Sequence, residues 1–472
     1  MRLPRLPLPF LDVRAGERGK TLGMFFYFLI VVAAYWFMKP LRSALTVEQL
    51  GADAIRELKM ITAVVSAGVV AAYSVALVRF SRERLTFLVL GAFFWTLLFF
   101  WFFFRNYGTV KVVYYCFYVF LDLFMTVNVA LFWTFLADIV RPESAARLYG
   151  VIGAGGVIGG VVGSYSNTVM ARVSPADLIL YVVMAYSLLF GIVTLVARRV
   201  RTLPHVESGV IARSGPSRWH DAVEGARLVA RTPYFLGICV VLASYEFIST
   251  VDDFALHKAV DLVFRRDGRV TSLLGTVLSG LGALTGRDVT GWFTHFAGLA
   301  VNEGSLRSFF SEFFFSVNLV ALVVQALLTS LVVRKFGMRC ALLVLPLIVL
   351  AVSTGFLLFP AFVLMEVLFL SDNALNYSIN QTSREMLFVP VPREDKYRAL
   401  AFIDMLVLRV AKATGGFLLI VLPVLAGAST VEGLRWCMLL TIPLAVVCAV
   451  VSIFLSARYN TVSNPGGPRH EP

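Results

Sequence analysis

The chain has 472 residues, of which 58% are hydrophobic and only 15% are charged. This composition excludes a soluble globular protein and is typical of a polytopic α-helical protein whose partner is the lipid bilayer. The formal net charge of +13 does not indicate nucleic-acid binding, because no polar segment interleaves basic with aromatic residues.

The first 19 residues are basic and contain prolines, but they lack the short apolar core of a cleaved signal peptide. The five cysteines lie in apolar runs at irregular spacing, and the five histidines are scattered. Neither pattern indicates a disulfide framework or a metal site. No polar segment holds a nucleophile with its base or a phosphate loop, so we expect no metal, no cofactor and no enzyme activity.

Runs of about 20 apolar residues are long enough to cross a bilayer. In chain order the sequence contains twelve such runs, and the tenth, the least apolar, is a candidate for a broken helix. We expect transmembrane helices near 20–44, 57–78, 85–104, 112–138, 147–171, 176–197, 233–257, 309–333, 340–358, 361–389, 397–425 and 431–457.

Lys and Arg are concentrated before the first run, in the even-numbered connections and after the last run. The positive-inside rule therefore places both termini in the cytoplasm, and we expect a multi-pass protein of the cell (inner) membrane. The polar connection 198–232 separates two sets of six helices, and 259–307 forms an extra-cytoplasmic insertion with an apolar stretch typical of interfacial helices. We therefore expect five segments in the chain. They are a cytoplasmic N-terminal segment (1–19), a first six-helix bundle (20–197), a cytoplasmic linker (198–232), a second six-helix bundle that contains the insertion (233–457) and a cytoplasmic tail (458–472).

The two halves share a weak repeat. Glu143 and Arg147 follow the fourth run, and Glu394 and Arg398 follow the tenth at the same i, i+4 spacing. Parallel repeats of six helices are typical of the major facilitator architecture, whose substrate site lies at the midplane between the halves. We therefore predict an all-α fold of 12 transmembrane helices in a 6+6 pseudo-symmetric bundle.

Two pairs of cations lie within the predicted spans, Lys39 with Arg42 and Arg409 with Lys412. The i, i+3 spacing puts each pair on one helix face. A charge at the bilayer centre costs roughly 2.5–3.5 kcal/mol on insertion scales, so such residues face a water-filled path and meet negative charge. Because Arg and Lys both bind phosphate, the pattern predicts an anion transporter. The alternative is that Lys39 and Arg42 lie at a helix end and reach the headgroups.

Carboxylates also fall within the runs, with Asp122 in the fourth and Asp252 and Asp253 in the seventh. They are candidates to pair with the cations when the site is empty or to carry protons, and the alternative is a fixed interhelical ion pair. Asn376 and Asn380 share a face of the tenth run and are candidates to hydrogen-bond a base or sugar, or to hold helices together.

A glycine-rich stretch opens the fifth run. Its small-xxx-small spacing predicts close packing of two membrane helices. A dinucleotide-binding loop would need a preceding strand and a βαβ unit, and neither is available here. The packing residues that we expect are Gly155, Gly156, Gly159 and Gly160.

Three blocks, Lys39–Ser43, Phe132–Gly150 and Thr382–Gly416, resemble the ATP/ADP translocases (nucleotide transporters) of plastids and obligate intracellular bacteria. Thr382–Gly416 resembles the family's segment from helix ten to a Gly-Gly pair in helix eleven. Its matching residues are Glu385, Met386, Pro390, Lys396, Ala401, Ile403, Asp404, Lys412, Gly415 and Gly416.

The resemblance implies ATP:ADP antiport, with transport-critical charges in helices one, four, seven and eleven. These charges map to Arg42, Asp122, Asp252 or Asp253, and Lys412. The chain departs from the family in using aspartate where glutamate is usual, and in its insertion. These departures leave open another nucleotide, a nucleotide-derived cofactor or a different phosphorylated anion as cargo.

Three hypotheses follow. The first is an antiporter of nucleotides or a related phosphorylated anion that works by alternating access, with Arg42, Lys412 and Arg409 on the phosphates. The second is a proton-coupled major facilitator transporter of another organic anion, with Asp122 or Asp252 as the proton carrier. The third is a non-transporting membrane scaffold that binds partners through 259–307. The sequence predicts no oligomeric state.

Overall fold

The computed structural model describes residues 17–108, 110–140, 142–170, 172–201, 218–285, 305–329, 332–426 and 431–463. Within these ranges every regular element is helical and no strand occurs, which confirms the all-α prediction. The side chains of the repeat residues Glu143, Arg147 and Glu394 lie outside the described part of the chain.

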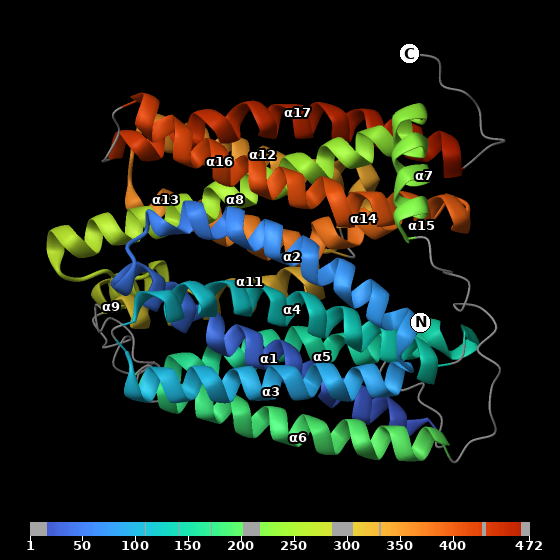
Figure 1. Cartoon of the computed structure of the whole chain (residues 1–472). Helices are drawn as coiled ribbons and strands as arrows, with labels where there is room; N and C mark the ends of the chain where they lie inside the picture. The colour runs from blue at the N-terminus through green and yellow to red at the C-terminus, as the bar shows by residue number, and fades with distance from the viewer. Residues whose placement is uncertain are drawn as a thin grey trace, which may run out of the picture.

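The first group of helices lies in the lower part of Figure 1. It consists of α1 (Arg18–Gln49), α2 (Ala54–Arg79), α3 (Arg82–Asn106), α4 (Lys111–Ile139), α5 (Pro142–Val169) and α6 (Pro175–Arg201).

Most of the second group lies above the first in the same view, while α9 and α11 lie lower, near the level of α4 (Figure 1). It consists of α7 (Arg218–Arg231), α8 (Pro233–Asp267), α9 (Leu273–Thr285), α11 (Leu306–Val323), α12 (Gly337–Leu358), α13 (Phe362–Leu375), α14 (Gln381–Leu387), α15 (Arg393–Phe402), α16 (Leu408–Ala426) and α17 (Val431–Ser463). Four π-helical segments join these helices: η2 (Val324–Thr329), η3 (Val332–Phe336), η4 (Asn376–Asn380) and η5 (Ile403–Val407).

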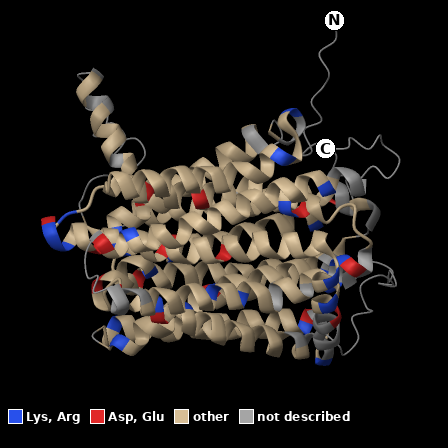
Figure 2. Ribbon diagram, turned by 90° about the horizontal axis from the view of Figure 1, so that it is seen from above, with Lys and Arg blue, Asp and Glu red and all other residues tan. Residues whose placement is uncertain are grey.

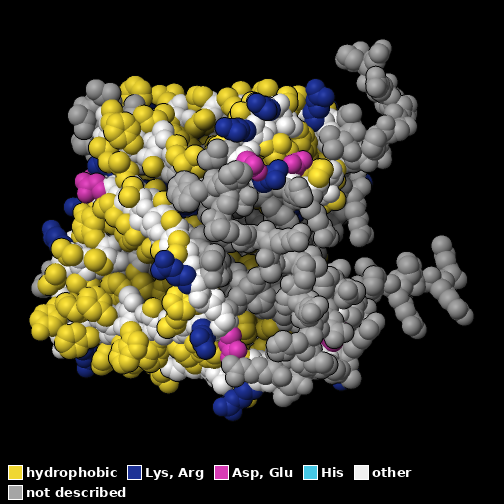
Figure 3. Space-filling view, turned by 45° about the vertical axis from the view of Figure 1, so that its right-hand side comes forward, with side chains coloured by type: hydrophobic (Ala, Val, Ile, Leu, Met, Phe, Trp, Pro, Cys, Tyr) yellow, Lys and Arg dark blue, Asp and Glu magenta, His cyan; other side chains and the backbone are white. Residues whose placement is uncertain are grey.

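Nine helices in the described ranges are long and apolar enough to cross a membrane. The helix α2 is not among them, and its first turns carry Arg56, Glu57 and Lys59. The predicted tenth and eleventh spans are each divided by a π-helical turn, so neither forms one long α-helix. Most described charged residues lie toward the two ends of the bundle (Figure 2), and hydrophobic side chains cover much of its visible flank (Figure 3). The chain therefore has the features of a multi-pass membrane protein, and the exact count of twelve spans stays a prediction.

Several helix boundaries differ from the sequence prediction. The helix α8 continues to Asp267, well past the expected end at 257, so the predicted insertion 259–307 begins with helix. It ends where Gly268 adopts φ 67°, a left-handed conformation that favours glycine. Beyond it, α9 is the described part of the insertion, and 286–304 lie outside the described residues. The last helix, α17, runs to Ser463, into the predicted tail.

The two groups meet mainly along three helix pairs: α2 packs against α16, α5 packs against α11, and α1 packs against α11. Smaller contacts join α8 to α1 and α2, and η5 to α2. The tightest packing within the first group joins α1 and α5. A Cβ atom at Gly155 would lie 2.5 Å from the carbonyl oxygen of Phe25, and one at Gly159 would lie 2.5 Å from that of Leu29. The backbones of α1 and α5 therefore approach closely only because these residues lack a side chain.

The other two glycines of the motif face different neighbours. A side chain at Gly156 would collide with the ring of Phe28 on α1. A Cβ atom at Gly160 would lie 2.5 Å from Oδ1 of Asn318 on α11. The glycine face of α5 thus contacts both α1 and the second helix group.

We expect Gly159→Ala to destabilise the protein by about 1–3 kcal/mol, because its methyl group overpacks the contact with α1. Gly153 on the same helix has open space around its Cβ position. Gly153→Ala is therefore the matched control, and alanine's better helix propensity should make it neutral or stabilising by up to about 1 kcal/mol. Thermal unfolding of the two purified variants measures the difference, and equal melting temperatures would contradict the packing role.

Candidate functional site

A cavity of about 190 Å³ lies between the two helix groups. The first group contributes residues of α1, α2 and α4, and the second contributes residues of α8, α13, η4 and α16. The lining residues are Tyr35, Lys39, Arg42, Lys59, Asp122, Tyr245, Glu246, Ser249, Thr250, Asp253, Phe369, Asn373, Asn376 and Lys412.

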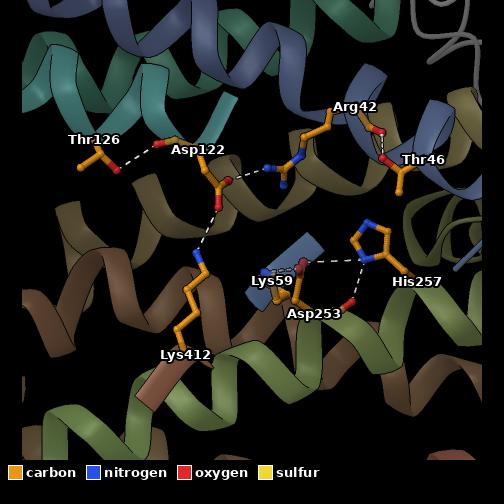
Figure 4. A network of polar contacts seen from close by, with 8 residues as sticks. All are labelled: Arg42, Thr46, Lys59, Asp122, Thr126, Asp253, His257 and Lys412. Carbon is orange, nitrogen blue, oxygen red and sulfur yellow. Dashed lines mark hydrogen bonds and ion pairs between the residues drawn. The ribbon is translucent and has the colours of Figure 1, made fainter. Parts of the chain in front are cut away.

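Asp122 on α4 binds two cations at once (Figure 4). Its Oδ1 lies 2.5 Å from Nη1 of Arg42 on α1, and its Oδ2 lies 3.0 Å from Nζ of Lys412 on α16. The Arg42 guanidinium also stacks over the ring of Tyr118 at 4.2 Å. Because α1 and α4 belong to the first group and α16 to the second, Asp122 joins the two groups across the cavity.

A second ion pair also crosses between the groups. Nζ of Lys59 on α2 lies 2.5 Å from Oδ2 of Asp253 on α8, and both side chains point toward one another in Figure 4. One turn further along α8, Nδ1 of His257 lies 2.6 Å from the backbone carbonyl oxygen of Asp253, to which it donates. The Asp253 side chain is thus fixed between a cation of the other group and a buried ring of its own helix.

Lys39 differs from the other three cations of the cavity. Within the described chain no carboxylate lies within ion-pair distance of its Nζ, which packs instead over the rings of Trp36 at 4.3 Å and Phe314 at 4.6 Å. Aromatic faces attract a cation without neutralising it. Lys39 therefore presents a positive charge to the cavity that no described carboxylate offsets directly.

Lys39 and Arg42 do not lie at the end of α1. The helix continues to Gln49, past the predicted end at 44, and the two side chains are only 6% and 3% exposed. Snorkelling requires a path along the helix to the headgroups, and residues enclosed by other helices have none. These cations therefore belong to the interior of the bundle.

Six of the predicted binding residues line the cavity: Lys39, Arg42, Asp122, Asp253, Asn376 and Lys412. Three others do not. Asp252 is buried behind the wall, where Oγ1 of Thr441 donates to its Oδ1 at 3.4 Å. Arg409 begins α16 one turn before Lys412 but is not part of the lining, and Asn380 donates to Oδ1 of Asn376 at 2.9 Å.

Lys59 was not identified from the sequence as a site residue, because it lies near the predicted start of the second run, where charges are common. Its burial depends on the contact between α2 and α16. A Cβ atom at Gly416 would meet the carbonyl oxygen of Arg56 at 3.3 Å and Cβ of Lys59 at 3.4 Å. The Gly-Gly pair of the eleventh span is thus the one sequence feature that could have indicated this contact.

The remaining lining residues of the second group are polar or aromatic. Glu246, Ser249 and Thr250 come from α8, and Phe369 and Asn373 from α13. Four cations and three carboxylates line the cavity. They are Lys39, Arg42, Lys59 and Lys412, and Asp122, Asp253 and Glu246. An anion that displaces the carboxylates would therefore find four positive groups around it.

A family model described as the TLC ATP/ADP transporter matches residues 107–286 and 363–459, which together make up more than half of the chain. The first segment contains Asp122, Asp252 and Asp253, and the second contains Asn376 and Lys412. Among curated proteins, none matches the chain significantly.

Several solved transporter structures share the fold. The nucleoside transporter NupG is 10% identical with a TM-score of 0.56, over 94% of this chain and 99% of that one. A bacterial homologue of the human lysosomal transporter Spinster, inward-facing and unoccupied, is 11% identical with a TM-score of 0.53, over 95% and 98%. A D-xylose-proton symporter is 13% identical with a TM-score of 0.55, over 92% and 96%. At these identities the likeness is one of fold alone.

We expect Lys59→Met to destabilise the protein by about 3–5 kcal/mol, because it leaves Asp253 buried without its cation. The double variant Lys59→Met/Asp253→Asn should recover most of this loss. The control is Lys258→Met, which removes an ion pair of 2.8 Å to Asp53, whose side chain is 53% exposed; such a pair contributes at most about 1 kcal/mol. Thermal unfolding compares the three variants, and similar losses for Lys59→Met and Lys258→Met would contradict the buried pair's role.

Proposed function

The chain belongs to the TLC ATP/ADP transporter family, and on this premise we propose that it exchanges nucleotides across the cell's inner membrane by alternating access. Membership of this family makes the protein a membrane transporter rather than an enzyme. The proposal extends this to the cargo, the site residues and the reason for exchange.

We propose twelve membrane crossings in two halves of six, 20–197 and 233–457, with both termini in the cytoplasm. The contacts between the helix groups support this symmetry. The second helix of the first half, α2, packs against α16, the fifth of the second half, and the fifth helix, α5, packs against α11, the second of the second half. Such reciprocal pairing is expected of two similar halves related by an axis along the membrane normal.

The phosphates of the cargo bind where the cations converge. Lys39 is free of a described carboxylate partner and can attract an anion first. Arg42 then exchanges Asp122 for a phosphate oxygen, since a guanidinium binds phosphate bidentately, and Lys412 and Lys59 follow as point charges. The cargo thus takes over cations that the protein's own carboxylates hold in the empty site.

The observation that carries the proposal is that two of the three ion pairs in the cavity connect the two helix groups. Lys412 reaches Asp122 from α16 to α4, and Lys59 reaches Asp253 from α2 to α8. Reorientation of the halves would break these pairs and leave buried charges uncompensated, which costs several kcal/mol. A phosphorylated cargo replaces the lost partners, so the loaded carrier reorients and the empty one does not. This difference produces exchange rather than net flux.

The base and sugar bind on the polar wall of the second half. Asn373 and Asn376 line the cavity there, and Phe369 offers a ring beside them. Asn380 orients the Asn376 amide through the hydrogen bond between them. An amide that can both donate and accept suits the edge of a nucleobase.

We expect Lys412→Ala to weaken nucleotide binding and exchange by about ten- to a hundredfold, since a charge-assisted hydrogen bond contributes about 1.5–3 kcal/mol. Arg42→Ala should lose at least as much. Binding is measured by thermal stabilisation with ATP, ADP, other nucleotides, NAD, phosphate and sugar phosphates, and exchange by labelled nucleotide in liposomes preloaded with ADP.

The matched control is Arg409→Ala, a cation of the same helix that does not line the cavity. It should retain exchange close to that of the unmodified protein. Normal exchange by Lys412→Ala, or stabilisation by a phosphorylated compound other than a nucleotide and by no nucleotide, would refute the proposed cargo site.

A further inference from the structure

Two buried carboxylates lie behind the wall of the cavity in the second helix group. Asp252 on α8 is 1% exposed and Asp372 on α13 is 0% exposed. Asp252 accepts from Thr441, but its Oδ2 and both oxygens of Asp372 have no hydrogen-bond partner. The Ser249 hydroxyl lies beside Asp372 but outside hydrogen-bond geometry. Three of the four carboxyl oxygens are thus unsatisfied.

The charged groups near this pair do not compensate it. The two carboxylates lie within electrostatic range of each other. On α8, Glu246 and Asp253 add further negative charge. The packed helix α17 faces Asp252 with the hydroxyl of Thr441 and the thiol of Cys437. From α1, Lys39 is the cation within range of Asp372, but it forms no ion pair with it in the described chain and packs on aromatic rings.

A buried carboxylate without a cation or hydrogen-bond donors is too costly to keep ionised, and it takes up a proton instead. Two such groups near each other strengthen this requirement, because ionising both adds like-charge repulsion. The buried pair Glu312 and Glu366 is different, since Ser272 and Ser308 donate to Glu312 and the backbone N–H of Leu273 donates to Glu366. The unsatisfied oxygens therefore single out Asp252 and Asp372.

We propose that Asp252 and Asp372 form a proton-binding site in the wall of the cavity, and that its proton crosses the membrane together with the anionic cargo. Asp252 directly precedes Asp253, which forms the ion pair with Lys59. When cargo takes Lys59, Asp253 loses its cation next to the proton site. Negative charge in this wall then rises, which favours protonation of the pair.

The proton also balances the charge of exchange. A nucleoside triphosphate carries one more negative charge than the corresponding diphosphate, so their one-for-one exchange moves net charge across the membrane. Moving this charge against the membrane potential costs free energy. One proton travelling with the triphosphate removes this cost. For the identity of the cargo, this step rests on the proposed function.

Infrared difference spectroscopy tests the site without any cargo. The unmodified protein should show the C=O stretch of a protonated carboxyl group that Asp252→Asn/Asp372→Asn lacks, and each single variant should lose part of it. The control is Asp177→Asn, at an exposed ion pair of 3.6 Å with Arg105, which should leave that band unchanged. Identical carboxyl bands in the unmodified protein and the folded double variant would overturn the proton site.

Liposomes test the coupling. With ATP outside, ADP inside and a pH-sensitive dye in the lumen, ATP entry through the unmodified protein should acidify the lumen, and an inward proton gradient should speed ATP uptake severalfold. The double variant should still exchange ADP for ADP at equal pH. An inward proton gradient should no longer speed its uptake of ATP. Exchange of ATP by the unmodified protein without acidification would overturn co-transport. Failure of the unmodified protein to exchange any nucleotide would instead refute the proposed function, and the infrared bands would still decide the proton site.

Discussion

The arrangement of the cavity depends on a single carboxylate that is shared by two cations. Asp122 binds Arg42 of its own helix group and Lys412 of the other group, and the ion pair of Lys59 with Asp253 joins the groups beside it. A buried charge network is stable only while each member keeps its partners. Whatever enters the cavity must therefore replace Asp122 as a partner before the helix groups can separate there.

The sequence predicts the kinds of charged residue at the site better than it predicts which individual residues line the cavity. Lys39, Arg42 and Lys412 follow from the cost of a charge in a bilayer, and the structure brings all three to one cavity. Arg409 has the same sequence signal but lies off the lining, because the spacing that puts it on one helix face with Lys412 does not fix how far along the helix the cavity extends. The sequence does not indicate Lys59 as a site residue, because its burial depends on contact with α16, which is distant in the sequence.

In the fold, too, features that depend on the local sequence are predicted well, and features that depend on packing between distant helices are not. The helices and the polar connection between their two groups follow from hydrophobic run lengths. The end of α8 at Gly268 differs from the prediction because the expected span stops near 257, whereas the helix continues beyond it through the charged residues that precede Gly268. The interruptions at η4 and η5 likewise depend on how neighbouring helices pack, and the sequence indicated a break only in the tenth run, the least apolar one.

The π-helical turns make the two sides of the cavity mechanically unequal. All four described segments of this kind lie in the second helix group, where η4 carries Asn376 into the lining, η5 directly precedes the helix of Lys412, and η2 packs against η4. A widened turn leaves the backbone hydrogen-bond ladder irregular and is a place where a helix can bend or shift register. The first group therefore acts as a stiff template for the charged end of the cargo, while the second is compliant. Tolerance toward cargoes of different length would then be a property of one wall, and changes in selectivity should accumulate there without disturbing the cations opposite.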